Sequence, residues 1–426
     1  MTRSPSRIAV IGSWHQSSVL CACFAEMGHH AVGISDDPAL TGLLAGRAPV
    51  HEPGLDALIG EMIKAGRLHF TKSFAEGLQG AAFAFLSIDT PVGPDDESDL
   101  EPIWRVVDQV AAAAPEGLVV VVTSQVPVGT TEQIARRLGG RLQVTYVPEF
   151  LRLSTALETF RKADRFVIGA DSPELAARVA AIYEPLGRPV HITDIRSAEM
   201  GKHAANAWLA TSVSFINQVA DLCEQVGADV REVATIMKLD PRVGPYAFLG
   251  AGLGYAGGTL GREIRALQKL GASHGVSTEL FDAVDAVNQR RIGHVVNRLR
   301  SMQVELDDMP IAVFGLTYKA GTSTLRRSAS LMLITELVAA GAHVSAYDPL
   351  AQLDEAADLP RFTMHREPGA AAEGASALIL MAPWPAELSP RRAAQLMARP
   401  LVLDTGNHLD RKAALDAGLE YQGMGR

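Results

Sequence analysis

The feature that most constrains this chain is a strand, turn, helix and strand unit near its amino end. Residues 8–11 form a short β-branched run that ends at Gly12, a helical stretch follows over residues 17–27, and residues 30–34 form a second apolar run. Three such elements within about 30 residues make a βαβ unit with parallel strands. We therefore expect the chain to begin with an open α/β sheet.

The same unit returns near the other end of the chain. Residues 311–315 repeat the apolar run and glycine of residues 8–12, and Tyr347-Asp348-Pro349 repeats Asp36-Asp37-Pro38. Self-similarity of this kind predicts two doubly wound α/β domains. Further runs of strand length lie at residues 84–88, 118–123, 144–147, 166–169, 377–381 and 401–404.

The middle of the chain has a different character. Residues 196–237 and 262–299 have helical periodicity, and a glycine-rich stretch, residues 244–258, separates them. We expect two doubly wound Rossmann-like domains, 1–195 and 301–426, joined by a helical central region, 196–300. An apolar stripe at helical spacing predicts that this central region forms the interface of a homodimer. The stripe consists of Trp208, Leu209, Val213, Ile216, Val219, Ala220 and Cys223.

Charge and cysteine content exclude several classes of protein. The chain has 39 Lys and Arg against 48 Asp and Glu, a formal net charge of −9. Such a chain has no bulk attraction to nucleic acid or to an anionic membrane. Its three cysteines form no CxxC pair, which excludes a disulfide scaffold and a cysteine zinc site, so we expect no metal. No apolar run approaches the length that spans a bilayer, and we expect a soluble cytoplasmic protein.

The turn after the first strand differs from an ordinary dinucleotide loop. A GxGxxG loop is expected there, but the chain has Gly12 followed by Ser13, Trp14 in place of the second glycine and Ser17 in place of the third. The second glycine normally lets the pyrophosphate approach the backbone. The ribose-binding acid is also displaced, with Ser35 in its place and Asp37 two residues later. A domain that no longer binds NAD in the usual way is the alternative left open.

Nine motifs in one order give the chain a resemblance to a known family. They are Glu52-Pro53-Gly54-Leu55; Asp89-Thr90-Pro91 with Asp99-Leu100; Ser124-Gln125-Val126-Pro127-Val128-Gly129-Thr130-Thr131; Val147-Pro148-Glu149-Phe150-Leu151-Arg152; Ala163-Asp164-Arg165; Ala198-Glu199-Met200-Gly201-Lys202-His203-Ala204-Ala205-Asn206-Ala207; Ser214-Phe215-Ile216-Asn217; Gly252-Leu253-Gly254-Tyr255-Ala256-Gly257-Gly258; and Phe314-Gly315-Leu316-Thr317-Tyr318-Lys319. The chain resembles the nucleotide-sugar 6-dehydrogenases, which act on UDP-glucose, GDP-mannose and UDP-N-acetylmannosamine. The likeness runs from about Ile8 to Asn407.

The resemblance implies an activity and, at one position, a departure from it. The family oxidises the sugar C6 hydroxyl to a carboxylate by two hydride transfers to NAD, and a cysteine captures the intermediate aldehyde. Thr259 stands where this cysteine belongs. A threonine hydroxyl has a far higher pKa than a thiol and is a poor leaving group. Cys21, Cys23 and Cys223 lie far from Thr259 in the sequence and are expected to be buried apolar residues.

The resemblance also assigns site residues. The implied catalytic residues are Glu149, Lys202, Asn206, Thr259 and Glu263. The implied cofactor-binding residues are Gly12, Ser13, Ser35, Asp37, Thr90, Gln125, Arg262 and Arg326. The implied substrate-binding residues are Phe150, Leu151, Arg152, Arg242, Tyr246, Gly254, Tyr255 and Lys319. Lys202 and Asn206 are four residues apart, so both can point from one helix face at one centre.

Further departures from the family motifs are Gln125, Leu153, Thr322-Ser323-Thr324 and Gly406. The losses fall on the dinucleotide loop, the ribose acid and the covalent nucleophile, whereas the sugar-nucleotide residues are kept. Two hypotheses follow. The first is an oxidoreductase of a UDP- or GDP-sugar that uses NAD or NADP and does not complete the second oxidation. The second is a non-catalytic homologue that binds a nucleotide sugar as a regulatory or partner subunit.

Overall fold

The structure is a computed structural model that describes residues 5–91, 98–256, 259–353 and 359–426. The chain divides into two compact units, Met1–Ala204 and Ala205–Arg426, which are described separately below. Gly257 and Gly258 of the glycine-rich motif lie outside the described residues.

Within its described residues the first unit is built on an eight-stranded sheet of order β3-β2-β1-β4-β5-β6-β7-β8. The strands are β1 (Arg7–Ile11), β2 (His30–Ile34), β3 (Leu68–Thr71), β4 (Phe83–Leu86), β5 (Val119–Val122), β6 (Gln143–Tyr146), β7 (Phe166–Gly169) and β8 (Val190–Thr193). Neighbouring strands are parallel except β6 and β7, which meet antiparallel at Tyr146 and Gly169. The parallel βαβ unit predicted at the amino end is confirmed.

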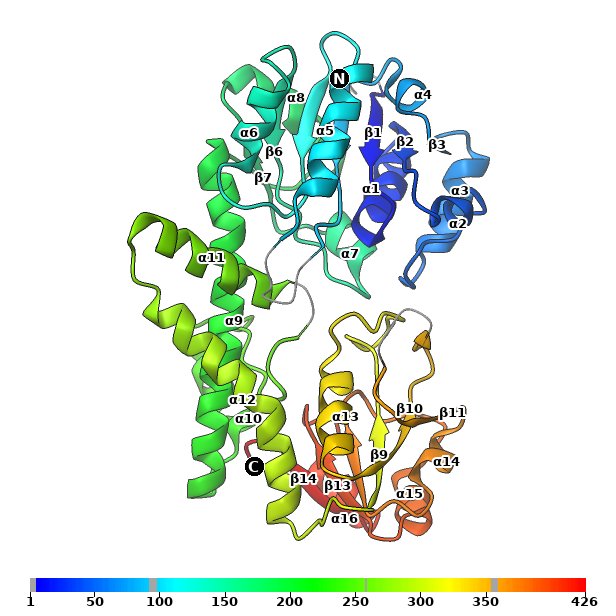
Figure 1. Cartoon of the computed structure of the whole chain (residues 1–426), viewed down its shortest axis with the longest axis vertical. Helices are drawn as coiled ribbons and strands as arrows, with labels where there is room; N and C mark the ends of the chain where they lie inside the picture. The colour runs from blue at the N-terminus through cyan, green and yellow to red at the C-terminus, as the bar shows by residue number, and fades with distance from the viewer. Residues whose placement is uncertain (1–4, 92–97, 257–258, 354–358) are drawn as a thin grey trace. The chain divides into compact units, whose positions relative to one another are not determined.

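Helices cover both faces of this sheet, as Figure 1 shows. They are α1 (His15–Glu26), α2 (Leu40–Leu44), α3 (Leu55–Lys64), α4 (Phe74–Leu78), α5 (Glu101–Ala113), α6 (Thr130–Arg137), α7 (Ala156–Arg161) and α8 (Pro173–Tyr183). One core cluster contains residues of α1, α3, α7 and α8, and the other contains residues of α5, α6 and the start of α9 (Ile195–Val226). Burial on both faces explains why the inner strands are continuous apolar runs.

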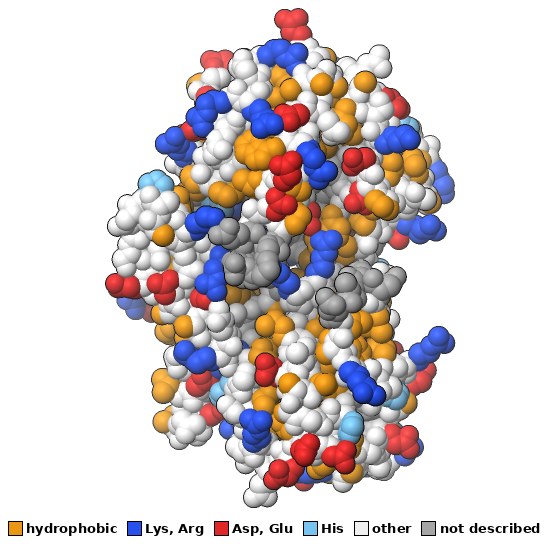
Figure 2. All heavy atoms as spheres, in the orientation of Figure 1, with side chains coloured by type: hydrophobic (Ala, Val, Ile, Leu, Met, Phe, Trp, Pro, Cys, Tyr) orange, Lys and Arg blue, Asp and Glu red, His pale blue; other side chains and the backbone are white. Residues whose placement is uncertain are grey.

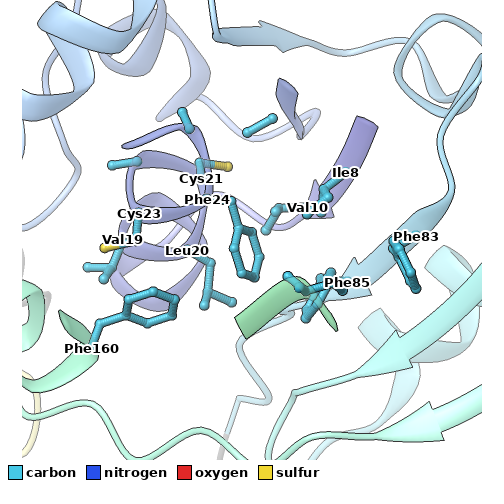
Figure 3. Packing of buried hydrophobic residues seen from close by; sticks show 14 of the residues in the cluster. Ile8, Val10, Val19, Leu20, Cys21, Cys23, Phe24, Phe83, Phe85 and Phe160 are labelled. Atoms are coloured by element: carbon cyan, nitrogen blue, oxygen red, sulfur yellow. The ribbon is translucent and has the colours of Figure 1, made fainter. Parts of the chain in front are cut away.

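The α1 helix is buried almost all round, and its aromatic residue anchors the first core (Figure 3). The ring of Phe24 lies 4.8 Å from that of Phe85 on β4 and 5.9 Å from that of Phe160 on α7, measured between centroids. Cys21 and Cys23 belong to the same cluster. The packing therefore fixes α1, and with it the start of the helix, against the sheet.

Within its described residues the second unit has a group of helices, α9 to α12, followed by a six-stranded parallel sheet of order β11-β10-β9-β12-β13-β14. After α9 come α10 (Val230–Leu239), α11 (Leu260–His274) and α12 (Glu279–Ser301). The remaining elements are β9 (Pro310–Phe314), α13 (Ala329–Ala339), β10 (His343–Tyr347), β11 (Thr363–His365), α14 (Pro368–Ala372), β12 (Ala377–Leu380), α15 (Pro390–Leu396), β13 (Leu401–Asp404), α16 (Arg411–Asp416) and β14 (Glu420–Gly423). Two Rossmann-like sheets with a helical region between them in sequence confirm the predicted fold class.

The two predicted helical stretches are each broken by a glycine. Gly227, with φ of 73°, follows α9, and Gly275, with φ of 68°, caps α11. Left-handed backbone of this kind ends helices, and glycine adopts it without strain.

The apolar stripe predicted on α9 is covered mostly by this chain itself, although its first residue, Trp208, is 70% exposed. Ile216, Ala220 and Cys223 are buried inside the second unit, where they pack against Val230 and Ala234 of α10. The sequence pattern shows which face of a helix is apolar, but it does not show which partner covers that face.

The surface in Figure 2 intersperses Lys and Arg with Asp and Glu, and no single sign dominates the visible face. No helix within the described residues is both long enough and apolar enough to cross a membrane.

Candidate functional site

The conformation of the loop after β1 requires a glycine at position 12. Its φ is +139°, and a Cβ there would lie 2.2 Å from the Ser87 carbonyl oxygen. The Gly12 N–H donates to the Ile34 carbonyl at 3.0 Å, which holds the turn against β2. Ser13 follows and is partly buried. The first glycine of the dinucleotide loop is therefore retained for a steric reason.

Trp14 and Ser17 replace the other two glycines with different consequences. Trp14 is the residue before α1, and its carbonyl accepts hydrogen bonds from the hydroxyls of Ser17 and Ser18, both at 2.8 Å. Ser17 thus fits against the turn because its hydroxyl donates to the Trp14 carbonyl. Trp14 places a partly buried indole where the second glycine normally leaves room for a phosphate.

His15 makes a buried hydrogen bond with Glu52. The Nε2 and Oε2 atoms are 2.8 Å apart, and the side chains are 6% and 1% exposed. The Glu52 carboxylate also accepts the N–H groups of Ser154 and Ala156, both at 2.9 Å. Burial alone would raise the pKa of Glu52, but the hydrogen bonds from His15 and the two amides outweigh it, and the net pKa is lowered.

After β2, the two residues predicted to bind a ribose make hydrogen bonds within their own turn. Ser35 is buried and its hydroxyl accepts the Asp37 N–H at 3.1 Å. The Asp37 carboxylate is exposed and accepts the Ala39 N–H at 2.8 Å just before α2. Both predicted ribose residues thus take part in a local turn.

The ends of β4 and β5 come together through Thr90 and Gln125. The Thr90 hydroxyl, which is buried, donates to the Gln125 carbonyl at 3.2 Å. Because the carboxyl ends of parallel strands meet at one edge of the sheet, Gly12 shares this edge. These residues fit a dinucleotide at the turn and along the strand ends, and they differ from the usual pattern at Trp14 and Ser35.

Two of the predicted catalytic residues, Glu149 and Lys202, lie together in the first unit with Phe150, which is predicted to bind substrate. The Lys202 Nζ donates to the Glu149 carbonyl and lies 4.6 Å from the centre of the Phe150 ring. Burial raises the pKa of Glu149 to about 7, although Lys202 opposes the shift. Among the described residues, the buried Glu149 Oε1 has no hydrogen-bond partner. A carboxyl with a near-neutral pKa and an unused oxygen can accept a proton at physiological pH.

The residues after Phe150 are divided between core and surface. Leu151 is partly buried against the first core, Arg152 is exposed, and Leu153 is partly buried. Asn206 lies one turn after Lys202 on α9 and is buried. Within the described residues its amide nitrogen has no hydrogen-bond partner.

The glycine loop of the second unit is held by Asn288 of α12. The Asn288 side chain accepts the Tyr255 N–H at 2.8 Å and donates to the Tyr255 carbonyl at 3.0 Å. Gly254 has φ of +85°, and a Cβ there would lie 2.2 Å from the Asn288 Oδ1. The paired hydrogen bonds fix this part of the loop and explain the glycine.

Thr259 is the residue before α11, and its carbonyl accepts the Glu263 N–H at 3.1 Å. Arg262 and Glu263 are both buried in the first turn of that helix. These three residues therefore lie within one helix turn. Their catalytic and cofactor roles remain predictions.

None of the three cysteines can replace a nucleophile at Thr259, because each is buried in a core. Burial raises the pKa of Cys21 far above its usual range, raises that of Cys23 to about 12, and also raises that of Cys223. A reactive cysteine needs an exposed thiolate.

The remaining predicted residues of the second unit are exposed. Arg242 pairs with Asp240 at 2.6 Å, and Tyr246 is 97% exposed. Lys319 and Arg326 are exposed in the loop that follows β9. The fold of one chain does not enclose any of these four side chains.

The loop after β9 is organised by Asp348 at the end of β10. One carboxylate oxygen accepts the N–H groups of Leu316 and Thr317 at 2.8 and 3.0 Å and the Thr317 hydroxyl at 3.1 Å. Asp348, which follows the second strand of this sheet as a ribose-binding acid would, therefore holds the loop after β9 in place.

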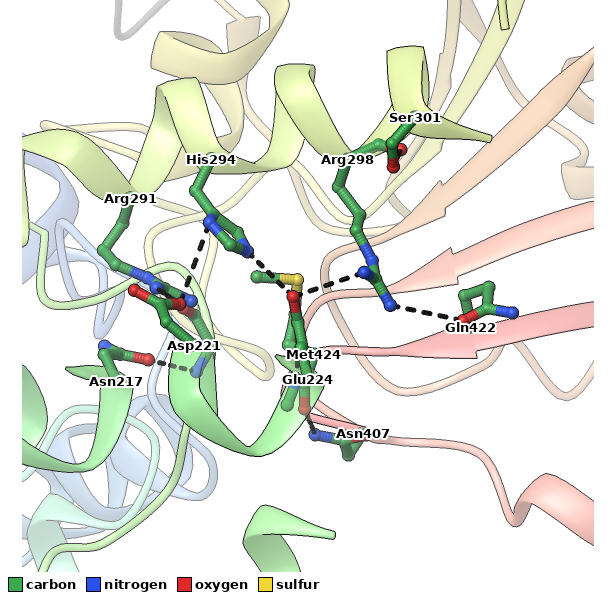
Figure 4. A network of polar contacts seen from close by, with 12 residues as sticks. Asn217, Asp221, Glu224, Arg291, His294, Arg298, Ser301, Asn407, Gln422 and Met424 are labelled. Atoms are coloured by element: carbon green, nitrogen blue, oxygen red, sulfur yellow. Dashed lines mark hydrogen bonds and ion pairs between the residues drawn. The ribbon is translucent and has the colours of Figure 1, made fainter. Parts of the chain in front are cut away.

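A polar network inside the second unit supports the glycine loop (Figure 4). Arg291 of α12 is buried, pairs with Asp221 of α9 and donates its Nε–H to the Gly252 carbonyl at 3.1 Å. The network continues through His294, Glu224, Arg298 and Gln422. An open pocket of about 550 Å³ lies beside it, and none of the predicted site residues lines this pocket. No group of three or more metal-binding side chains occurs among the described residues.

Sequence reasoning did not assign a role to three residues that the structure places beside the predicted sites. His15 and Glu52 form the buried pair described above. The Arg165 guanidinium lies 4.7 Å from the Phe150 ring centre. Glu52 and Arg165 belong to motifs that carry the resemblance, whereas nothing in the sequence marked His15.

Comparison with known proteins is consistent across the whole chain. Residues 6–187 match the UDP-glucose/GDP-mannose dehydrogenase family NAD binding domain, residues 196–290 its central domain and residues 312–411 its UDP binding domain. A UDP-glucose 6-dehydrogenase of Pseudomonas aeruginosa is 35% identical, with 99% of this chain and 97% of that protein covered. One of Bacillus subtilis is 34% identical, with 98% and 97% covered. The structure of a UDP-glucose dehydrogenase from Pyrobaculum islandicum matches with a TM-score of 0.88 and 30% identity over 97% of this chain and 96% of that one.

Proposed function

The chain belongs to the UDP-glucose/GDP-mannose dehydrogenase family, and from that premise we propose that it oxidises a UDP-sugar once, at C6, and releases the aldehyde. The observation that carries this proposal is the chemistry at the start of α11. The motif resemblance implies that Thr259 stands in the position of the family's cysteine, and all three cysteines of the chain are buried. The chain is an oxidoreductase by family, and NAD is the cofactor that the matched domain implies.

The first oxidation needs a base and a cation, and the first unit has both. NAD, when bound, would supply the acceptor for the hydride that leaves C6. Glu149 takes the hydroxyl proton, because a pKa of about 7 leaves much of its carboxyl ionised at neutral pH. Lys202, fixed by the Glu149 carbonyl and the Phe150 ring, stabilises the oxygen as negative charge develops on it. Gly12, Thr90 and Gln125 would hold the cofactor at the sheet edge.

The second oxidation of the family needs a thiolate, which adds to the aldehyde and later leaves as the acid is released. Threonine adds poorly, because its hydroxyl is not ionised at neutral pH, and it leaves poorly from an ester. Without a thiolate at this position the second oxidation should not proceed, which supports the aldehyde as the final product.

Product analysis tests the proposal directly. UDP-glucose, GDP-mannose and UDP-N-acetylmannosamine would each be incubated with NAD and the purified protein, with an aldehyde trap present. We expect NADH and trapped aldehyde in equal amounts and no sugar acid. Thr259→Cys should allow some acid to form, and Thr259→Ser, which adds no thiol, is the matched control. Sugar acid at multiple turnovers from the unaltered chain would contradict the proposal.

A second candidate function is a non-catalytic subunit that binds a nucleotide sugar. Trp14 at the second glycine and the turn formed by Ser35 and Asp37 favour it, because both remove ordinary dinucleotide contacts. Calorimetric titration with NAD and NADP distinguishes the two candidates. Saturable binding of either dinucleotide supports the enzyme, and binding of a UDP-sugar without either supports the subunit.

We also propose that the protein is a homodimer whose interface uses α9 and α10. Exposed apolar residues repeat along α9 at spacings of seven, seven and four, namely Trp208, Phe215, Leu222 and Val226. Ile236 and Leu239 of α10 are exposed too. A continuous apolar stripe on a helix is typical of a helix-to-helix contact. Light scattering at micromolar concentration should give twice the chain mass of 45.4 kDa, and a value near 45.4 kDa would refute a stable dimer.

Arg242 and Lys319 test the sugar-nucleotide side of the proposal. A second chain can bring the exposed Arg242 to a ligand, and Lys319 offers charge beside the loop after β9. Charge-assisted contacts are worth about 1.5–3 kcal/mol each. Arg242→Ala and Lys319→Ala should each weaken UDP-sugar binding about ten- to a hundredfold and leave the fold intact. If the unaltered chain binds no nucleotide sugar with a Kd below about 1 mM, the predicted nucleotide-sugar site is not functional, and both candidate functions lose support.

A further inference from the structure

Glu52 lies where two loops of the first unit meet. The loop from β1 leads into α1, whose first residue is His15, and the loop that begins at Glu149 contributes the N–H groups of Ser154 and of Ala156, the first residue of α7. All three hydrogen bonds end on the same carboxylate, at 2.8, 2.9 and 2.9 Å. A side chain 1% exposed cannot exchange these donors for water without opening the structure.

The two loops carry different parts of the proposed chemistry. The loop after β1 contains Gly12 and Ser13, which the resemblance assigns to the dinucleotide. The second loop begins at Glu149 and Phe150, which contact Lys202. Only a few residues separate Phe150 from Ser154, and Ser154 has a φ of 70°, a conformation that costs a non-glycine residue free energy. The hydrogen bonds to Glu52 hold that conformation in place.

We propose that the His15–Glu52 pair is a positioning device that couples the dinucleotide loop to the sugar-side loop, so that ordering one loop orders the other. The proposal rests on the proposed function for the identity of the two ligands. Displacement of His15 removes the donor that orients the Glu52 carboxylate, and the carboxylate then holds Ser154 and Ala156 less firmly. His15 and Glu52 are positioning residues, since they act on substrate and cofactor through the loops.

Gln16, which follows His15 in the first turn of α1, gives a matched control. Its amide nitrogen donates to the carbonyl and the hydroxyl of Thr123, both at 3.1 Å, and this anchor does not pass through Glu52. Gln16→Leu should loosen the loop after β1 without affecting Ser154 and Ala156. His15→Leu and Gln16→Leu therefore separate coupling through Glu52 from general loosening of the loop.

Hydrogen exchange of the ligand-free protein tests the coupling without any assumption about activity. In His15→Leu we expect the amides of residues 152–157 to exchange about ten- to a hundredfold faster, because a charge-assisted hydrogen bond is lost. His15→Gln, which keeps a donor near the position of Nε2, should restore slow exchange, and Gln16→Leu should leave it unchanged. Should His15→Leu not fold, His15→Phe fills the volume without a donor and serves as the same test. Unchanged exchange of residues 152–157 in the folded variant would overturn the proposal.

Ligand binding supplies the second readout. In the unaltered protein, NAD should tighten the binding of a UDP-sugar about fivefold or more, and the UDP-sugar should tighten NAD equally. In His15→Leu this mutual effect should disappear, whereas His15→Gln keeps it. Absence of the mutual effect in the unaltered protein, or its persistence in His15→Leu, contradicts the coupling. If the unaltered protein binds neither ligand, the proposed function fails, and hydrogen exchange still decides the coupling.

Discussion

The loop after β1 and the loop after β9 start from the same strand and glycine pattern but are built differently. In the first unit β1 ends at Ile11 and α1 begins at His15, so the helix start lies close to the sheet edge. In the second unit β9 ends at Phe314 and α13 begins only at Ala329. The acids that follow the second strands also differ: Asp37 caps a local turn, whereas Asp348 holds the loop after β9.

This difference shows that one sheet topology can carry two differently built loops after its first strand. A helix that begins at once aims its first N–H groups at an anion at the sheet edge. After β9 the helix begins much later, so the residues next to the strand end belong to a long loop. Lys319 is exposed on this loop. The strand order alone therefore does not state what each unit binds.

Replacement of Gly12 or Gly315 by alanine should have the largest effect on the free energy of unfolding. Each replacement should destabilise only the unit that contains it. Gly12→Ala places a Cβ 2.2 Å from the Ser87 carbonyl oxygen, and Gly315→Ala places one 2.5 Å from the Ala382 Cβ. Each combines a clash with a positive φ, which together should cost about 3–5 kcal/mol of unfolding free energy. Hydrogen exchange resolved by unit is the measurement.

Two other glycines are the controls for that experiment. Gly117 and Gly374 also have positive φ, but a Cβ there meets nothing within 4 Å. Their alanine variants should cost only about 1 kcal/mol. Equal losses at all four positions would show that backbone conformation, and not the close approach of neighbouring strands, requires the glycines of the two loops.

The pH dependence of stability should differ between the units because of Glu149. Its pKa in the folded state is about 7, above its ordinary value of 4.5, so the folded state keeps a proton that the unfolded chain has lost. Stability of the first unit should fall as the pH rises from about 4.5 to 7, by up to about 3 kcal/mol. Denaturant unfolding of Glu149→Gln should lack this loss. The same pH slope in both proteins would exclude Glu149 as its source.

Asp348→Asn tests whether the loop after β9 depends on its acid. The carboxylate oxygen that accepts three hydrogen bonds is replaced by an amide that accepts on one side only. Loss of charge-assisted bonds should cost about 2 kcal/mol and raise exchange of the Leu316 and Thr317 amides. Asp37→Asn, at an exposed turn of the first unit, should change stability by less than about 1 kcal/mol. Similar effects at Asp37 and Asp348 would remove the contrast between the loops.

Trp14→Gly should have the smallest effect on the fold and a specific effect on binding. Removal of the indole restores room for a pyrophosphate at the start of α1, and dinucleotide affinity should rise by roughly 1–3 kcal/mol, about ten- to a hundredfold. UDP-sugar affinity, measured by the same calorimetry, is the internal control and should not change. NAD bound to the unaltered chain with its pyrophosphate against Gly12 and Ser13 would show that Trp14 is no obstacle.

The sequence predicted the interior of each sheet better than its edges. The strand-length runs near β1, β2, β4, β5, β6, β7, β12 and β13 were recognisable, because burial on both faces requires continuous apolar residues. The strands without such a run, β3, β8, β11 and β14, are the edge strands of the two sheets. All residues of β8 are at least partly exposed. An edge strand needs no apolar run, so no local pattern marks it.

The sequence by itself determined the fold class and the family resemblance, because these depend on residue types in a fixed order. Only the tertiary structure decided which apolar face of α9 is buried, since Ile216 and Trp208 lie on the same helix and differ only in what covers them. It also decided the partners of Glu52. His15 and Ser154 are far apart in the chain, and their meeting on one buried carboxylate follows from how the sheet brings its loops together.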